Sequence, residues 1–481
     1  MVTVVRRNQS LLELFGHPEV GSGVPCRVSC YNFVVASDDG NMLVYNTLCN
    51  AFAIVDNKTW DSVASGSDAG ITKDDFDNLV NSGILVPESF DEHRTYLERF
   101  EFLQHLSQLN SGVVRYNIYT TTYCNARCPY CFESGIPRKH MDASTADKVV
   151  SYIKSSYSRT ADEIYFRWFG GEPLVNARII SHICKQVKEI GVPFYSTTST
   201  NGLLLDKDLI KIAMSEWNLK KVRFSFDGLG DVHNNRKNFI GFKGDPFEVT
   251  LNNMDSAISA GLRVVVRLTL DLANSASLSD LATMLISRYK GCKNVALYSK
   301  CIFSEVSHDK YKSNSKAVAA LLEANASLTE SLINSGMYDY ERLAPAGLRT
   351  YFCAANDPHK VVISPSGELC SCECNCVKSE YWGDVVHGVT NNACYEKWHC
   401  APTIGGKCKD CPLLPVCTPY ASICPSDYFS CHDRFETTMR LFMIENYRRH
   451  KNGLPLLLDS ETFASYRLLT TSDIHGKEVI T

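Results

Sequence analysis

The sequence lacks the features of several classes of protein. Its 481 residues contain no apolar run long enough to span a bilayer, and the first residues do not have the basic-then-apolar pattern of a signal peptide. The net charge of −4 gives no reason to expect a nucleic acid or an anionic membrane as a partner. No internal repeat or low-complexity run is present. We therefore expect a cytoplasmic globular protein of two to four domains.

Cysteine, by contrast, is abundant and unevenly placed. The chain has 21 cysteines, and twelve of them lie between positions 353 and 431. Such density is typical of small secreted domains held by disulfide bonds, but this chain is large and has no export signal. Metal or iron–sulfur ligation is therefore a better interpretation of the cysteines than a disulfide scaffold.

Three closely spaced cysteines give the clearest chemical signal. Cys124, Cys128 and Cys131 lie in the run YTTTYCNARCPYCF. Four cysteine thiolates normally hold a 4Fe–4S cluster. Three thiolates would bind three of the irons and would leave the fourth iron open to a substrate or a cofactor.

Residues 1–100 are predicted to form a separate unit. Its expected elements are strands at 27–36, 42–45 and 83–87 and helices at 46–55 and 73–82. This order of elements resembles a winged helix, which would bind a peptide. A structural cap on the next domain fits the same pattern, and the sequence leaves both interpretations open.

From residue 113 onward, strands and helices alternate. The strands are expected at 113–120, 163–169, 193–200, 221–226, 263–270 and 294–301. The helices are expected at 145–157, 178–190, 207–215, 247–260, 278–289 and 315–335. Six such units predict a parallel sheet with right-handed crossovers, but they are too few to close an eight-stranded barrel. We expect an α/β fold with a partial (β/α)6 barrel over residues 101–340.

The rest of the chain has a different pattern. Residues 341–434 are rich in cysteine and short turns and are expected to form an iron–sulfur domain with little helix. Residues 435–481 are expected to form a tail that contains an amphipathic helix at 435–450.

Glycine and polar residues recur where the predicted strands end, together with one proline. They are Gly170, Gly171, Glu172, Pro173, Ser199, Asn201, Asp227 and Arg267. Ligands collect at the carboxyl ends of parallel strands, so these residues predict a cofactor site at one rim. Ser199, Asp227 and Arg267 also fit an ordinary structural role, because polar strand ends occur in every α/β protein.

The cysteine loop and the Gly-Gly-Glu-Pro motif resemble those of radical S-adenosylmethionine (SAM) enzymes, over residues 113–300. The resemblance implies that Cys124, Cys128 and Cys131 hold a 4Fe–4S cluster whose open iron chelates SAM. One electron, from a flavodoxin or ferredoxin, would then release a 5′-deoxyadenosyl radical. The implied SAM contacts are Tyr130 near the adenine, Gly170, Gly171, Glu172 and Pro173 near the methionine amino group, Ser199 and Asn201 near the ribose or carboxylate, and Arg267 on the carboxylate.

The later cysteines resemble the SPASM extension of radical SAM enzymes that modify peptides and proteins. This resemblance implies two auxiliary 4Fe–4S clusters, and therefore three clusters in all. The implied ligands are Cys408, Cys411, Cys417 and Cys431 for the outer cluster and Cys353, Cys372 and Cys424 for the inner one. The spacing departs from the family pattern, because six residues rather than three separate Cys417 from Cys424. The fourth inner ligand stays open among Cys370, Cys374, Cys376 and the substrate, and zinc also suits the Cys408–Cys411 pair.

The combined resemblance is to maturases of ribosomally made peptides. It implies that residues 1–100 grip the leader of a precursor peptide and that the radical forms a thioether or another crosslink. A sulfatase maturase that makes formylglycine, a peptide epimerase and a carbon–carbon cyclase are alternatives. An iron–sulfur electron-transfer protein is an alternative of a different class.

Overall fold

The computed structural model describes residues 1–18, 23–67, 70–109, 112–302, 315–342, 354–376, 379–399, 408–409, 411–416 and 431–459. The chain divides into two compact units. The first unit contains residues 1–109, 340–353 and 401–481, and the second contains residues 110–339 and 354–400. The functional domain boundaries expected from the sequence stay a prediction. No helix in the described ranges is both long and apolar enough to cross a membrane.

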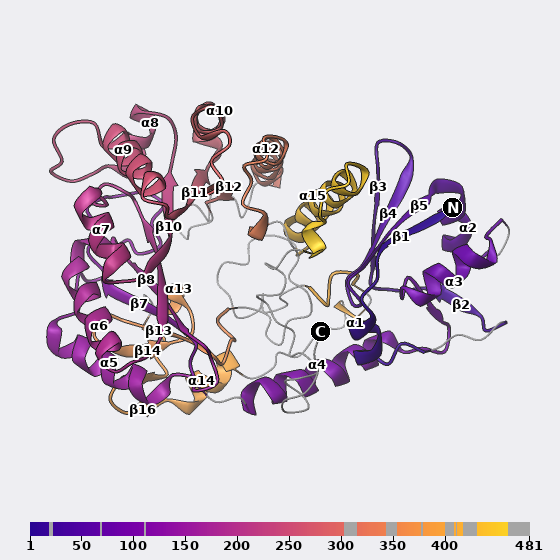
Figure 1. Ribbon diagram of the computed structural model, residues 1–481, viewed down its shortest axis with the longest axis horizontal. Helices are drawn as coiled ribbons and strands as arrows, with labels where there is room; N and C mark the ends of the chain where they lie inside the picture. Colours follow the sequence, from indigo (N-terminus) through magenta and orange to yellow (C-terminus); the bar gives the residue numbers. More distant parts are fainter. Residues whose placement is uncertain are drawn as a thin grey trace. The chain divides into compact units, whose positions relative to one another are not determined.

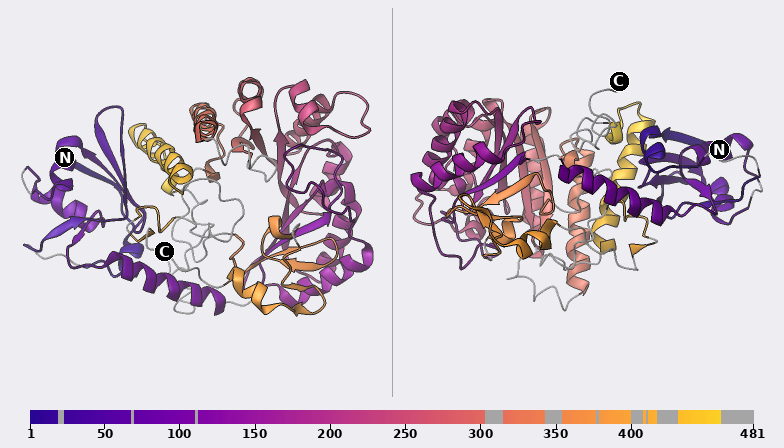
Figure 2. Two further views of the ribbon diagram at one scale, coloured as in Figure 1. Left: turned by 180° about the vertical axis from the view of Figure 1, so that it is seen from behind. Right: turned by 90° about the horizontal axis from the view of Figure 1, so that it is seen from below.

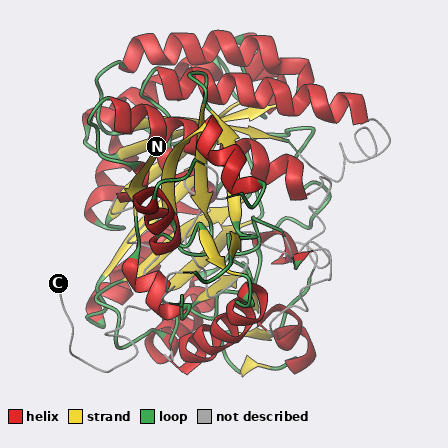
Figure 3. Cartoon of the chain, turned by 90° about the vertical axis from the view of Figure 1, so that its right-hand side faces the viewer, coloured by secondary structure: helices red, strands yellow, loops and turns green. Residues whose placement is uncertain are grey.

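The second unit is built on a parallel sheet whose strands follow the order of the chain. These strands are β7 (Arg115–Thr121), β8 (Ile164–Gly170), β9 (Phe194–Thr200), β10 (Leu219–Phe226), β11 (Arg263–Leu270) and β12 (Val295–Cys301). The helices are α5 (Ala143–Ser156), α6 (Ala177–Glu189), α7 (Lys207–Ser215), α8 (Asp231–Lys237), α9 (Pro246–Ser259), α10 (Ser275–Tyr289) and α12 (Ser315–Asn334). The predicted α/β fold with an open, partial barrel is confirmed (Figures 1 and 3).

The cysteine-rich segment extends this sheet on the far side of β7. Strand β13 (Lys360–Ile363) pairs in parallel with β7, and Lys360 lies opposite Arg115. The antiparallel strands β14 (Glu368–Cys370), β15 (Gly383–Asp384) and β16 (Gly388–Val389) follow. Two short helices, α13 (Glu373–Cys376) and α14 (Asn392–His399), complete the segment. The sequence did not indicate this junction, because it joins residues that are far apart in the chain.

Side chains alternate across the parallel strands. Val264, Val266 and Leu268 of β11 are buried, whereas Arg263 and Arg267, which alternate with them along the strand, are half-buried. The helices α5, α6 and α7 cover one side of the sheet (Figures 1 and 2). We call the other side, which carries Arg263 and Arg267, the open face.

Glu373 of α13 fixes the cysteine-rich segment to the open face. Its carboxylate lies 3.3 Å from Lys360 Nζ and 3.2 Å from an Arg167 guanidinium nitrogen, and it also accepts a hydrogen bond from Asn117. The Tyr119 hydroxyl donates to the Glu373 carbonyl at 3.0 Å. Burial alone would raise the pKa of Glu373, but Lys360 and Arg167 outweigh it and lower this pKa to about 2.

The first unit contains an antiparallel sheet in the order β1-β5-β4-β3. Its strands are β1 (Val2–Arg6), β3 (Asn32–Ala36), β4 (Asn41–Asn46) and β5 (Ala51–Asp56), and β2 (Cys26–Val28) pairs separately with β6 (Leu85–Pro87). The helices are α1 (Gln9–Leu14), α2 (Asn57–Ala64), α3 (Lys73–Asn81), α4 (Glu92–Leu109) and α15 (Cys431–Lys451). The tail helix expected at 435–450 therefore exists, and it packs on β4 through Phe442 and Tyr45, whose rings are 5.7 Å apart.

Two local expectations for this unit were wrong. The predicted helix at 46–55 is largely strand β5, because the apolar run AFAIV pairs with β1 on one side and β4 on the other. The single strand expected at 27–36 is two strands, β2 and β3. The chain turns between them where the buried Glu92 carboxylate accepts hydrogen bonds from the Ser29 hydroxyl and, at 3.1 Å, from the Cys30 amide.

Replacing Glu373 with glutamine should destabilise the second unit. The substitution leaves the buried Lys360 ammonium without its counter-charge, which costs about 3 kcal/mol at neutral pH. Because the folded pKa of Glu373 lies below its unfolded value, the stabilisation is present above the unfolded pKa and is lost as the pH falls toward 2. The measurement is the free energy of unfolding in urea of cluster-free E373Q and wild-type protein, from neutral pH down toward pH 2. The exposed Glu163→Gln should change the free energy of unfolding by less than about 0.5 kcal/mol, and equal effects of the two variants would contradict the prediction.

Candidate functional site

The three-cysteine loop begins at the carboxyl end of β7. Cys124, Cys128 and Cys131 are half-buried and free of disulfide bonds. Burial raises the pKa of Cys124 to about 12 and that of Cys131 to about 11. Iron binds the thiolate, so cluster uptake would release protons from these two side chains.

The Gly-Gly-Glu motif at the end of β8 holds the beginning of this loop. The Gly171 amide donates to the Thr121 carbonyl at 3.1 Å, and the Glu172 amide donates to the Tyr123 carbonyl at 2.8 Å. A Cβ atom on Gly170 would lie 2.1 Å from the Thr121 carbonyl oxygen, and one on Gly171 would lie 2.4 Å from the Tyr123 carbonyl oxygen. Both glycines are therefore required by the close approach of the two backbones.

The Glu172 side chain joins the ends of β8 and β9. It is 1% exposed, and it accepts hydrogen bonds from the Leu174 amide at 3.2 Å, the Thr200 hydroxyl at 2.8 Å and the Asn201 amide at 2.8 Å. Burial raises the pKa of Glu172 to about 7, against the effect of these three donors. Both carboxylate oxygens are thus bound within the protein, and the contact with a methionine amino group stays a prediction.

Asn201 and Asn125 join the end of β9 to the cysteine loop. The Asn201 side-chain amide donates to the Asn125 side-chain oxygen at 2.6 Å, and the Asn201 side-chain oxygen accepts from the Leu203 amide at 3.1 Å. The expectation that strand ends converge on the cysteine loop is met at this point.

Ser199 and Arg267 occupy the open face on two different strands. Arg223 donates to the Ser199 hydroxyl at 3.3 Å. Arg267 lies opposite Ser225 on one side and Tyr298 on the other. Its Nε atom is buried and has no hydrogen-bond partner among the described residues. Such a donor fits a bound carboxylate.

A buried network beside the loop joins Tyr130 and Asp227 to Lys237, a residue that the sequence analysis missed. Lys237, the last residue of α8, places its ammonium 3.2 Å from Asp227, 3.0 Å from the Ser225 hydroxyl and 3.2 Å from the Tyr130 hydroxyl. The Tyr130 hydroxyl donates to Asp227 at 2.5 Å. Burial alone would lower the pKa of Lys237, but the charge of Asp227 outweighs it and raises this pKa above its usual value.

The backbone after α8 holds the other side of the cysteine loop. The Arg127 amide donates to the Lys237 carbonyl at 2.8 Å, and the Ile240 amide donates to the Asn125 carbonyl at 2.9 Å. Asn238 between them has a φ of 49°, a left-handed conformation that asparagine tolerates. Helix α8 is short and begins directly after Gly230, so no clear helical periodicity could reveal it from the sequence.

The auxiliary cysteines are described only in part. Cys372 lies with Cys370, Cys374 and Cys376 on and beside α13 in the second unit, whereas Cys408 and Cys411 pack against a hydrophobic cluster of the first unit. Cys353, Cys417 and Cys424 lie outside the described residues, as does the side chain of Cys431. Where the structure is described, no three acidic, histidine or cysteine side chains surround a point suited to one metal ion. A multi-iron cluster instead distributes its ligands over several irons.

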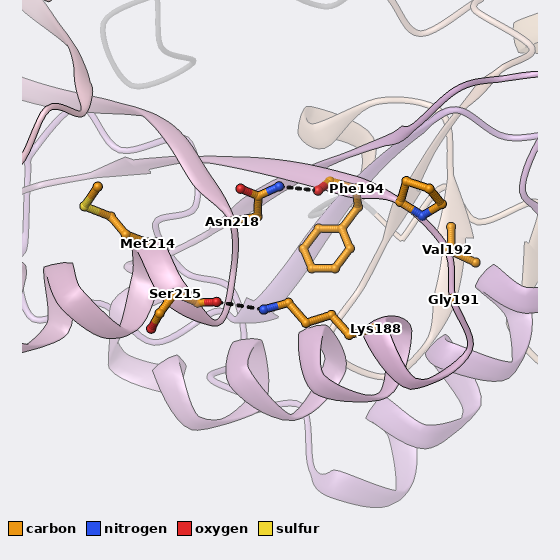
Figure 4. Close-up of a pocket in the computed structure, with 8 residues that line it drawn as sticks. Lys188, Gly191, Val192, Phe194, Met214, Ser215 and Asn218 are labelled. Carbon is orange, nitrogen blue, oxygen red and sulfur yellow. Dashed lines mark hydrogen bonds between the residues drawn. The ribbon is translucent and has the colours of Figure 1, made fainter.

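A pocket lies at the amino-terminal ends of β9 and β10, opposite the strand ends that carry the cysteine loop. Figure 4 shows Lys188 and Asn218 in its wall. Lys188 Nζ donates to the Ser215 carbonyl at 2.7 Å, and the Asn218 side-chain amide donates to the Phe194 carbonyl at 2.6 Å. These polar groups are bound to the backbone, and the pocket holds none of the predicted site residues.

Comparison with known proteins assigns the segment that holds the site. Residues 118–279 match the family model of the radical SAM superfamily. This segment is a radical SAM domain. The family implies a 4Fe–4S cluster and SAM, and the half-buried thiols and the unpaired Arg267 Nε fit these two groups.

Curated and structural relatives extend the comparison. The probable GTP 3′,8-cyclase of Methanococcus maripaludis is 29% identical over 147 residues, which are 31% of this chain and 46% of that protein. The chain thus spans less than half the length of this relative. The structure of native anSMEcpe with bound AdoMet has a TM-score of 0.53 at 14% identity and covers 70% of this chain and 98% of that chain. The structure of the same protein with bound AdoMet and Cp18Cys peptide has a TM-score of 0.52 at 14% identity. It covers 70% of this chain and 98% of that chain. These two structures share the fold.

Gly171→Ala should displace the cysteine loop. The Cβ atom of the new alanine would lie 2.4 Å from the Tyr123 carbonyl oxygen and 2.8 Å from the Thr122 carbonyl oxygen, so the backbone of one of the two segments must move. We expect a loss of more than about 2 kcal/mol in the free energy of unfolding, together with a loss of iron bound after reconstitution. Gly191→Ala is the control, because its Cβ would meet nothing within 4 Å and only its φ of 73° is unfavourable. Wild-type iron content in G171A would contradict the prediction.

Proposed function

We propose that this protein is a radical SAM enzyme that modifies a ribosomally made precursor peptide. The observation that carries the proposal is the contact between Gly171, Glu172 and the backbone of the cysteine loop, inside the segment that matches the radical SAM family. A peptide substrate is supported by anSMEcpe, which shares the fold and has been solved with a bound peptide.

In this proposal, Cys124, Cys128 and Cys131 hold the first cluster, and when bound, the cluster and SAM supply a 5′-deoxyadenosyl radical. Arg267 pairs with the methionine carboxylate as a two-pronged donor. Tyr130, fixed by Asp227, presents its ring to the adenine. Gly170, Gly171, Glu172 and Pro173 border the amino group, and Ser199 and Asn201 border the ribose or carboxylate.

The later cysteines would hold two auxiliary clusters and bring the total to three. The outer cluster would use Cys408, Cys411, Cys417 and Cys431, and the inner cluster would use Cys353, Cys372 and Cys424. An inner cluster at Cys372 would lie next to Glu373, whose ion pairs with Lys360 and Arg167 fix α13 to the open face. Such a cluster would supply an acceptor for the electron left after the peptide is oxidised.

The leader of the precursor would bind the first unit. Among the described residues, β3 pairs only with β4, so its outer edge offers backbone donors and acceptors to an added strand. Holding the leader there raises the local concentration of the core peptide at the radical site. The product is a thioether or another crosslink, and formylglycine formation, epimerisation and carbon–carbon cyclisation use the same radical. The GTP cyclase match covers 147 residues and 46% of that protein, so it does not carry that protein's substrate to this chain.

The test is incubation of reconstituted protein with a peptide encoded next to its gene, under reducing anaerobic conditions. We expect 5′-deoxyadenosine and a peptide that has lost two hydrogens. Replacement of Cys124, Cys128 and Cys131 by alanine should abolish both products, while Cys292→Ala, which changes an exposed cysteine outside every proposed site, should leave them unchanged. Loss of two hydrogens without 5′-deoxyadenosine would contradict the proposal.

The Lys237–Asp227 pair should set the reduction potential of the first cluster. Lys237→Met removes a buried positive charge next to the cysteine loop, so added electrons become less stable and the potential should fall. Asp227→Asn leaves that charge uncompensated, so the potential should rise. Shifts on the order of 50 mV are expected from Coulomb's law for a buried unit charge beside the cysteine loop. EPR-monitored titration measures both, and two shifts of the same sign would indicate structural disturbance instead.

A further inference from the structure

Two buried donors on the open face of β11 have no hydrogen-bond partner in the part of the chain that the structure describes. One is the hydroxyl of Thr269, a residue that is 0% exposed, and the other is the Nε atom of Arg267. Successive side chains of a strand point to opposite faces, so Thr269 shares the open face with Arg267, and Leu268 between them points to the other side. Both donors belong to the carboxyl-terminal half of β11, which ends at Leu270.

Polar groups next to these donors are bound elsewhere. Ser225 lies opposite Arg267 on β10, but its hydroxyl accepts a hydrogen bond from Lys237 Nζ at 3.0 Å. The Thr269 carbonyl accepts a hydrogen bond from the Asn274 side-chain amide at 2.9 Å, which fixes the backbone at the end of β11. A buried hydroxyl that lacks a partner carries a desolvation cost, and a bound ligand that accepts its proton removes this cost.

The charge of Arg267 is not balanced by any carboxylate of the described residues. Two carboxylates at the ends of β10 and β11 have other basic partners, because Asp227 lies 3.2 Å from Lys237 and Asp271 lies 3.7 Å from Arg236. Within the described ranges, no acidic side chain lies at ion-pair distance from the Arg267 guanidinium. Arg267 therefore suits an anionic ligand.

A carboxylate fits both donors at once. Side chains two residues apart on one face of a strand are separated by about 7 Å, and a long arginine side chain can close part of this gap. One carboxylate oxygen can then accept a hydrogen bond from the guanidinium and the other from the hydroxyl, and the charge of Arg267 is compensated. A neutral carbonyl group would leave that charge uncompensated.

We propose that Thr269 and Arg267 together bind the carboxylate of the methionine part of SAM. The guanidinium supplies the opposite charge. The Thr269 hydroxyl, carried on a stiff β-branched side chain, fixes the orientation of the carboxylate relative to β11. The inference rests on the proposed function, in which Arg267 is the basic partner of this carboxylate, and it adds Thr269 as a second binding residue.

Two variants of Thr269 separate ligand binding from stability. Thr269→Val keeps the shape of the side chain and removes the hydroxyl. The affinity of the reconstituted protein for SAM should therefore fall about tenfold, while the urea midpoint of unfolding without SAM should stay the same or rise. Thr269→Ser keeps the hydroxyl and removes a buried methyl group, so the affinity should stay close to that of wild type while the midpoint falls. Anaerobic equilibrium dialysis measures the affinity.

A matched control and a SAM analogue test the assignment further. Thr198→Val removes a buried hydroxyl that donates to the Trp168 carbonyl at 3.4 Å on the other face of the sheet. This variant should lower the urea midpoint and leave the SAM affinity unchanged. Decarboxylated SAM lacks the proposed partner of Thr269, so wild-type protein and Thr269→Val should bind it equally.

Three results would overturn the inference. They are equal SAM affinities of wild type and Thr269→Val, an equal loss of affinity for SAM and for decarboxylated SAM, and a loss confined to binding of the precursor peptide. Wild-type protein that binds no SAM would contradict the proposed function itself, whereas SAM binding that Thr269→Val leaves intact would refute the role of Thr269 alone.

Discussion

The close approach of two backbones at the ends of β7 and β8 determines the rest of the site. Gly170 and Gly171 let the chain pass within hydrogen-bonding distance of Thr121 and Tyr123, where any side chain would collide with a carbonyl oxygen. This contact sets the path of the cysteine loop. Glu172 then carries the constraint to β9, because its buried carboxylate accepts bonds from Thr200 and Asn201.

A second constraint acts on the loop from the opposite side. The carbonyl of Lys237 accepts the Arg127 amide, and the Lys237 ammonium is neutralised inside the protein by Asp227. The loop is thus held by β8 on one side and by the end of α8 on the other. Both contacts are made largely by backbone groups, so they fix the cysteines without consuming side chains that a cofactor would need.

Much of the second unit could be predicted because its signals are local. The strand expected at 263–270 is β11 with the same bounds, and the helix expected at 207–215 is α7 with the same bounds. Apolar runs and helical periodicity are properties of neighbouring residues. The pairing of β13 with β7 and the identity of β5 depend instead on distant partners, so the sequence could not indicate them. In the site, the convergence of Gly171, Glu172 and Asn201 followed from the strand-end rule. Lys237 could not be found, because its role depends on a buried charge partner.

The central claim is that three thiolates leave one iron open to SAM. The most direct measurement is the EPR spectrum of the reduced, anaerobically reconstituted protein before and after addition of SAM. The account predicts that SAM changes the g-values of one cluster signal and that this change is absent when Cys124, Cys128 and Cys131 are replaced by alanine. A wild-type spectrum that SAM leaves unchanged, from protein with a full complement of iron, would contradict it.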